Sequence, residues 1–129
     1  MIAIDTHVLV RLLSRDNEHQ FAIAYKIFAA HEVFIPDTVI LETERVLRHA
    51  YDFPKEKITA ALILVFGLPN VHVHQAETIA SVIDWYKQGL DFADAFHLAG
   101  AQHTESIKTF DQHFAKRAVG LSVCPAELL

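Results

Sequence analysis

The stretch Ile2-Ala-Ile-Asp-Thr-His-Val-Leu-Val-Arg-Leu-Leu13 indicates which kind of fold this chain adopts. A short apolar run, Ile2 to Ile4, is typical of a strand, and it closes at Asp5. The residues that follow Asp5 are predicted to form a helix. Passing from a strand through an acid into a helix is typical of α/β proteins, whose sites form at the carboxyl ends of parallel strands.

Short strand-like runs and longer helical patterns alternate along the rest of the chain. The apolar spacing predicts helices within residues 21–29, 39–50, 58–66, 79–86, 92–103 and 112–117. Further strands are expected at 33–35, 71–74, 106–110 and 121–123. Strands separated by helices favour right-handed crossovers and a mostly parallel sheet with helices on both faces. We therefore predict an α/β fold in a single domain, residues 1–129.

Composition and charge exclude several classes of protein. With 129 residues, 52% of them hydrophobic and 21% charged, the chain can bury a core and is not a disordered tail. The longest apolar run, 60–68, is about half of what a membrane-spanning helix needs. No signal peptide is apparent, and Cys124 as the only cysteine excludes a disulfide framework, so we expect a cytoplasmic protein. The net charge of −5 means that something besides side chains must attract any phosphate.

Acidic residues occur where a parallel sheet would bring them to one edge. They directly follow predicted strands or lie in the opening of predicted helices: Asp5, Asp37, Glu42, Asp91, Asp94 and Asp111. Carboxylates within about 4–6 Å repel one another unless a cation neutralises them. Oxygen ligands with few imidazoles favour Mg²⁺ or Mn²⁺, ions that support phosphodiester cleavage. We expect a shared metal site, held by Asp5, Glu42, Asp94 and Asp111.

Each of these acids also has a simpler structural interpretation. Three of them precede predicted helices and could act only as N-caps: Asp5, Asp91 and Asp111. Asp94 could complete a box-like capping pair with Asp91. Glu42 could be an ordinary solvated helix residue, and Glu44, two residues on, is expected to be one. The set of acids therefore favours a metal site more strongly than any single member does.

Four ordered segments of this chain resemble the PIN-domain ribonucleases, and most closely the VapC toxins of bacterial and archaeal toxin–antitoxin pairs. The segments are Ile4-Asp-Thr-His-Val-Leu-Val-Arg-Leu-Leu13, Ile40-Leu-Glu-Thr-Glu-Arg-Val-Leu47, Asp91-Phe-Ala-Asp-Ala-Phe-His-Leu-Ala99 and Thr109-Phe-Asp-Gln-His-Phe114. The resemblance implies a PIN-like three-layer α/β/α sandwich, with a central sheet of about five strands. It also implies a Mg²⁺- or Mn²⁺-dependent endoribonuclease site. Residue by residue, the acids that match the family are Asp5, Glu42, Asp94 and Asp111, with Asp91 as an extra acid of a subset.

Two positions depart from the family pattern. His7 stands where the family usually has Asn, and an imidazole that titrates near neutral pH could make the site sensitive to pH. His113 stands where many relatives carry another acid, so one bound ion is the minimum expectation. Thr6 and Thr109 lie beside the acids, and their hydroxyls could support a carboxylate.

Basic residues and apolar faces indicate partners. Several cations lie downstream of the acids and could bind RNA phosphates, although they could equally be solvated charges: Arg11, Arg15, Arg45, Arg48, Lys116 and Arg117. The apolar faces within 21–28 and 58–66 exceed what a short chain hides easily. The resemblance implies that such faces serve a homodimer and a cognate antitoxin.

Other kinds of acidic site fit less well. A phosphoryl-accepting receiver domain needs a lysine at a late strand end, whereas Lys108 lies inside its predicted strand. A haloacid-dehalogenase-type phosphatase needs a second aspartate at the position of His7. A catalytically silent PIN-fold binding module stays open as the main alternative to the endoribonuclease.

Overall fold

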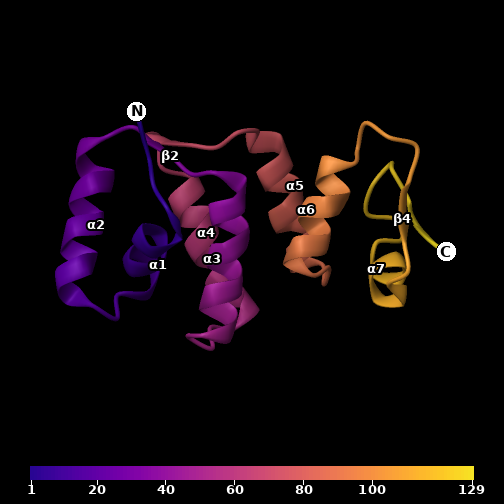
Figure 1. Cartoon of the computed structure of the whole chain (residues 1–129), viewed down its shortest axis with the longest axis horizontal. Coiled ribbons are helices and arrows are strands. Elements are labelled where there is room, and N and C mark those ends of the chain that lie inside the picture. Colours follow the sequence, from indigo (N-terminus) through magenta and orange to yellow (C-terminus); the bar gives the residue numbers. More distant parts are fainter. The chain divides into compact units, whose positions relative to one another are not determined.

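Strands and helices alternate along residues 1–129, all of which the computed structural model describes (Figure 1). The strands are β1 (Ile2–Ala3), β2 (Val33–Phe34), β3 (Val71–His72), β4 (Ile107–Thr109) and β5 (Ala126–Leu128). The helices are α1 (Thr6–Ser14), α2 (Glu18–Ala30), α3 (Asp37–His49), α4 (Lys55–Phe66), α5 (Ala76–Lys87), α6 (Phe92–Gly100) and α7 (Gln112–Arg117). None of these helices has the length and apolar character needed to cross a membrane. The predicted α/β alternation is confirmed.

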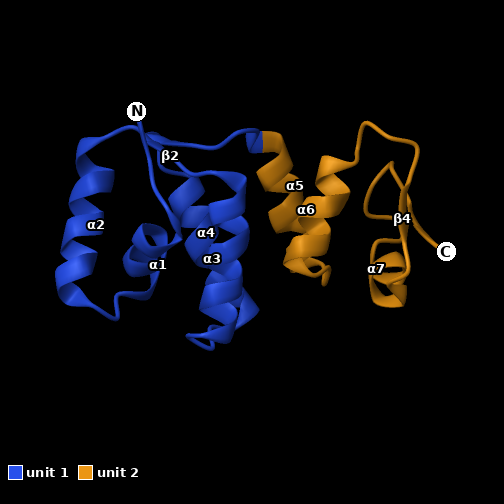
Figure 2. Ribbon diagram, in the orientation of Figure 1, with its two compact units in different colours: residues 1–76 blue, residues 77–129 orange.

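The chain divides into two units, Met1–Ala76 and Glu77–Leu129 (Figure 2). Unit 1 holds a parallel sheet in the order β1-β2-β3, and unit 2 holds the parallel pair β4-β5. Every strand pairing within each unit is therefore parallel, and the hydrogen bonds join three strands in unit 1 and two in unit 2. The prediction of one domain over residues 1–129 stays a prediction.

The last strand lies further along the chain than the sequence predicts. We expected it at residues 121–123, but β5 begins at Ala126. Gly120, with a φ of 77°, turns the chain, and the Ser122 hydroxyl donates to the carbonyl of Cys124. The pairing with β4 starts where the Ile107 amide donates to the carbonyl of Pro125, at 2.9 Å. The apolar residues within 121–123, predicted to form a strand, therefore belong to this turn.

In unit 1 the helices pack closely around the sheet. Helix α1 packs against α2 and α3, and α3 packs against α4. Leu9, Ile40 and Leu62 are fully buried members of this core. The Asn70 side chain fastens the end of α2, because its amide donates to the carbonyls of Phe28, at 2.6 Å, and His31, at 2.8 Å.

Helix α4 is only partly buried. The sequence, apolar nearly all round between Ile58 and Phe66, predicts a buried or partner-covered helix. Ile58, Leu62 and Val65 do enter the core of unit 1. Leu64, however, is 74% exposed. One face of α4 is therefore core, and the other is apolar surface.

Aromatic contacts organise unit 2. The ring of Tyr86 on α5 meets that of Phe92 on α6 edge to face, with centroids 4.9 Å apart, and Phe92 meets Phe96 at 5.5 Å. Helix α7 packs against β4 and β5 and buries Phe114. These contacts fix the first turns of α6 and α7, at which Asp91, Asp94 and Asp111 lie.

Candidate active site

Asp5 lies where the sequence predicts, just past the end of β1. Its carboxylate caps α1 by accepting a hydrogen bond from the Val8 amide, at 3.3 Å, while the residue is exposed. Thr6, next to it, is buried. The predicted capping role is confirmed, and the carboxylate still keeps lone pairs for another partner.

Asp37 and Glu42 stand on α3, which follows β2. Because β1 and β2 are parallel, the start of α3 lies at the same sheet edge as Asp5. The Oδ1 atom of Asp37 is buried and accepts no hydrogen bond, while Glu42 is exposed. A buried carboxylate oxygen without a partner is costly. Asp37 is thus an acid that the sequence interpretation left out of the site, although its position directly after a strand pointed to it.

In unit 2, three aspartates form what we call the acidic trio: Asp91, Asp94 and Asp111. Asp91 caps α6 by accepting a hydrogen bond from the Asp94 amide, at 3.2 Å. Asp111 caps α7 by accepting one from the Phe114 amide, at 3.1 Å. Both predicted caps are therefore confirmed, and neither accounts for the side chain of Asp94.

Thr109 supports Asp111 through the backbone and not, as expected, through the carboxylate. Its hydroxyl oxygen accepts a hydrogen bond from the Asp111 amide, at 2.9 Å, across the end of β4. This contact fixes the position of the Asp111 backbone at the end of the strand. The threonine therefore positions the acid rather than contacting its carboxylate.

The pKa of Asp94 is raised above its ordinary value of 3.8. Burial is the largest cause, followed by the negative charges of Asp91 and then Asp111, while His97 opposes the rise. The acidic trio is therefore close enough for its members to repel one another. A cation among them would relieve that repulsion.

The chemistry of the trio fits a hydrated magnesium or manganese ion. Neither unit by itself gathers three or more histidine, cysteine, aspartate or glutamate side chains into a ready-made metal cage. Mg²⁺ does not need such a cage, because it usually keeps several waters and binds through one or two carboxylates. The carboxylates of the trio are the hard oxygen donors that such an ion prefers.

Glu44 is not the solvated residue that we expected. Its side chain is only 2% exposed, and Arg48 donates to both of its carboxylate oxygens, from Nε at 2.8 Å and from Nη2 at 3.3 Å. The reason is its position on the helix, since Ile40 and Leu47, both fully buried, lie four residues before it and three after it. The spacing could have predicted this burial.

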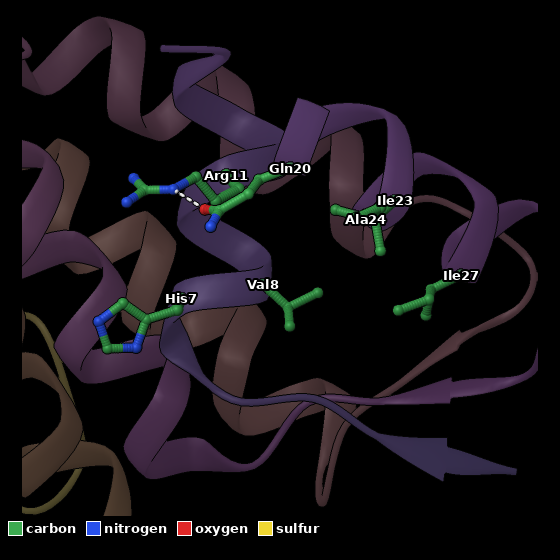
Figure 3. Close-up of a pocket in the computed structure, with 7 residues that line it drawn as sticks. All are labelled: His7, Val8, Arg11, Gln20, Ile23, Ala24 and Ile27. Carbon is green, nitrogen blue, oxygen red and sulfur yellow. Dashed lines mark hydrogen bonds between the residues drawn. The ribbon is translucent and has the colours of Figure 1, made fainter. Parts of the chain in front are cut away.

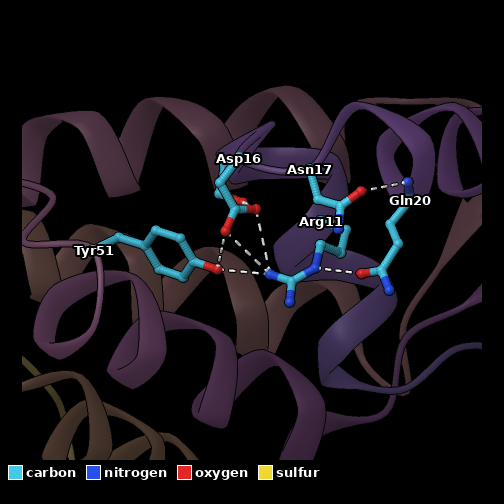
Figure 4. Close-up of polar contacts among 6 residues, drawn as sticks. Arg11, Asp16, Asn17, Gln20 and Tyr51 are labelled. Atoms are coloured by element: carbon cyan, nitrogen blue, oxygen red, sulfur yellow. Dashed lines mark hydrogen bonds and ion pairs between the residues drawn. The ribbon is translucent and has the colours of Figure 1, made fainter.

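Arg11 belongs to a network of polar contacts within unit 1 (Figure 4). We call this set, Arg11, Asp16, Gln20 and Tyr51, the Arg11 network. Nη1 of Arg11 donates to Asp16 at 3.3 Å and to the Tyr51 hydroxyl at 2.6 Å, and Nε donates to Gln20. The Tyr51 hydroxyl donates to Asp16 at 2.8 Å. The guanidinium predicted to bind phosphate is thus held by its own chain.

The Arg11 network also explains why the pKa of Asp16 is lowered. The largest cause is the hydrogen bond from Tyr51, followed by the bond from Ser14, and the charge of Arg11 adds to both. This carboxylate is exposed and well supplied with donors. It therefore needs no further cation.

The other predicted phosphate-binding residues fall into two groups. Arg15 lies over the ring of Phe21, 4.1 Å from its centroid, and Arg48 is paired with Glu44. Arg45 and Lys116 are exposed. Arg15 and Arg48 are exposed as well, but the Phe21 ring and the Glu44 carboxylate already engage their charges.

An apolar groove of about 280 Å³ runs between α1 and α2 (Figure 3). Val8 on α1 faces Ile27 on α2 across it, and Ile23 is 49% exposed. The complete lining is His7, Val8, Arg11, Gln20, Ile23, Ala24 and Ile27. The groove thus begins at the first turn of the helix that Asp5 caps.

Comparisons with known proteins identify a family. The family model described as PIN domain matches residues 2–120. Among solved structures, the crystal structure of the Mycobacterium tuberculosis toxin VapC20, which cleaves the sarcin–ricin loop, is 19% identical to this chain, with a TM-score of 0.46 over 97% of this chain and 99% of that chain. No curated protein matches the chain.

Proposed function

Because the chain belongs to the PIN domain family, we propose that it is a metal-dependent endoribonuclease, the toxin of a VapC-type toxin–antitoxin pair. The observation that carries the proposal is the acidic trio, in which burial and then the charges of Asp91 and Asp111 raise the pKa of Asp94. Carboxylates that are crowded together repel one another, and a divalent ion bound among them would neutralise that repulsion. The four ordered motifs of the sequence resemble those of VapC toxins, and this resemblance supports the assignment as a toxin.

We assign the acids to distinct tasks in this reaction. Asp94 and Asp111, with Asp5 and Glu42, would hold Mg²⁺ or Mn²⁺, and Asp91 would add charge beside them. When bound, such an ion supplies an activated water and stabilises the leaving oxygen of the phosphodiester. Thr109 holds the backbone of Asp111, and the buried Thr6 and the neighbouring His7 flank Asp5.

The substrate that we propose is single-stranded RNA, such as a loop of a structured RNA, because unstacked segments can enter a site that a duplex cannot. Arg45 and Lys116, both exposed, would contact its phosphates. We further propose that residues 1–129 act as one PIN domain, since a single family match runs across both units.

The groove between α1 and α2 supports a protein partner. Its apolar lining and the exposed Ile23 suit the apolar face of a partner helix, and we propose the cognate antitoxin as that partner. The exposed apolar face of α4, with Leu64, suits a second copy of the chain, so we propose a homodimer as well.

The decisive experiment compares cleavage of a total RNA pool by the wild type and by Asp5→Asn. Cleavage with Mg²⁺ or Mn²⁺ that stops in EDTA, and that Asp5→Asn lacks, is the expected result. Equal cleavage by both proteins would contradict the proposed site. No cleavage by the wild type, freed of any antitoxin, would favour a silent binding module.

A further inference from the structure

Phe110 is the one exposed phenylalanine of the nine in this chain. Its side chain is 82% exposed, whereas Phe92 and Phe114, its counterparts in the core of unit 2, are 1% and 3% exposed. Burying such a ring would stabilise the fold, and the chain does not use that stabilisation here. The position of the ring therefore calls for a role outside the core.

Hydrogen bonds fix the backbone on both sides of Phe110, which directly precedes Asp111 of the acidic trio. On one side, Thr109 accepts a hydrogen bond from Leu129 at 2.8 Å, as β4 pairs with β5. On the other side, Asp111 is fixed by Thr109 and caps α7. Phe110 thus lies between the end of β4 and the N-cap of α7, one residue before Asp111.

The surroundings of Phe110 favour a nucleic acid over a protein partner. The exposed side chains that follow it on α7 are polar or basic: Gln112, His113, Lys116 and Arg117. An aromatic ring interleaved with cations is typical of surfaces that bind single strands, where every base can stack on the ring. The other large hydrophobic side chains exposed in this unit offer no second ring: Val119, Val123, Leu128 on the paired strand, and Leu129.

We propose that Phe110, the residue before Asp111, is a stacking platform for a base of single-stranded RNA. The inference rests on the proposed ribonuclease function and adds to it a residue that binds the substrate. Stacking tolerates any base, so Phe110 contributes affinity and position rather than sequence preference. In a chain with a net charge of −5, such a contact draws RNA to the acids without relying on positive charge.

The test measures binding of a short, fluorescently labelled oligoadenylate by anisotropy, in the Asp5→Asn background so that the RNA stays intact. Phe110→Ala is expected to weaken binding by about 5- to 150-fold, and Phe110→Leu by a similar factor, since neither side chain has a π face. Phe110→Trp is expected to bind at least as tightly as the parent. The matched control Leu128→Ala, an exposed apolar residue on the paired strand, is expected to change binding by less than about twofold.

A second arm removes the bases instead of the ring. An abasic oligonucleotide of the same length should bind Phe110→Ala and the parent equally, because the ring then has nothing to stack on. Equal losses for Phe110→Ala and Leu128→Ala on oligoadenylate, or retention of affinity by Phe110→Leu, would overturn the proposal. A melting curve for each variant checks the fold, which an exposed ring should not disturb.

The two proposals fail separately. Cleavage of total RNA by the wild type, together with unchanged binding and cleavage by Phe110→Ala, would remove the stacking contact and leave the nuclease intact. Binding that depends on Phe110 without any cleavage would remove the nuclease and support the contact. Absence of binding by the parent would overturn the contact as well.

Discussion

Asp16 and Asp94 are two aspartates whose surroundings move the pKa in opposite directions. Asp16, in the Arg11 network of unit 1, receives hydrogen bonds from Tyr51 and Ser14 and lies beside Arg11, so its pKa is lowered. Asp94, in the acidic trio of unit 2, is partly buried beside two other acids, so its pKa is raised. The same side chain is thus satisfied in one region and crowded in the other.

The difference separates structural acids from functional ones. A carboxylate that already has donors and a cation, like Asp16 or the buried Glu44, supports the fold. A carboxylate that has like charges for neighbours destabilises the fold when it is ionised. It remains available to bind an external cation. Four predictions test whether this division is correct.

The largest expected effect concerns catalysis. Asp94→Asn should lower the rate of RNA cleavage by more than about 100-fold, because loss of even an outer-shell partner of a metal typically costs about 10- to 100-fold. Asp16→Asn, the matched control, should change the rate by less than about twofold. Initial rates on one RNA substrate measure both. Similar losses in the two variants would show that the division fails.

The second prediction concerns the metal without reference to cleavage. Mg²⁺ should raise the melting temperature of the wild type, since a ligand at about 100 times its dissociation constant adds about 2.7 kcal/mol to stability. Asp94→Asn should gain clearly less. Thermal melts with increasing Mg²⁺ and with EDTA measure the difference.

The same two proteins, measured without metal, should differ in how their stability depends on pH. Because the folded-state pKa of Asp94 is raised, its ionisation costs stability as pH rises through the raised pKa, and that cost is absent below 3.8. In EDTA at neutral pH, Asp94→Asn should therefore melt above the wild type, and the gap should close as pH falls below 3.8. A lower melting temperature for the variant at neutral pH would contradict the prediction.

The third prediction sharpens the comparison with a buried pair. Arg48→Met leaves the carboxylate of Glu44 buried without its main cation, which should cost about 1–3 kcal/mol of unfolding free energy. Lys108→Met breaks the exposed pair with Glu127 and should cost about 0–1 kcal/mol. Urea denaturation of both variants gives the two values. Equal values would mean that Glu44 has enough other support.

The smallest expected effect is on Asp16 itself. Tyr51→Phe removes the strongest cause of its lowered pKa, so the pKa should rise toward 3.8. The stability that this lowered pKa provides is present above 3.8 and is lost as pH falls through the folded-state value, so wild type and variant should differ above 3.8 and converge in acid. An NMR titration of Asp16 measures the shift. Tyr25→Phe, on the exposed side of α2, is the control that should leave it unchanged.

Periodicity and punctuation predicted most of the fold. The α/β alternation, the position of α7 and the helix caps at Asp5, Asp91 and Asp111 follow from local rules, and the structure confirms them. The resemblance to PIN domains is confirmed by the family match. The last strand was misplaced because apolar letters near Gly120 do not reveal a turn.

The candidate site was predicted only in part, for physical reasons. The candidate acids followed from strand ends and helix starts, and helix spacing could have predicted the burial of Glu44, but the unpaired oxygen of Asp37 depends on how the chain packs around it. The engagement of Arg11 by Tyr51 joins residues 40 positions apart, which no local pattern predicts. The roles of Asp5, Glu42, Asp94 and Asp111 stay predictions.

The helix caps at Asp5, Asp91 and Asp111 bear on how an inert form of this protein should be made. Each of these carboxylates holds a backbone amide of the first helical turn. Asparagine keeps that bond, whereas alanine costs about 1 kcal/mol at each position. Three alanines would remove a sizeable part of the roughly 5–15 kcal/mol that a domain possesses. An inactive variant for binding RNA or crystallising a complex is therefore better made with asparagines. Its loss of activity then reflects lost chemistry and not unfolding.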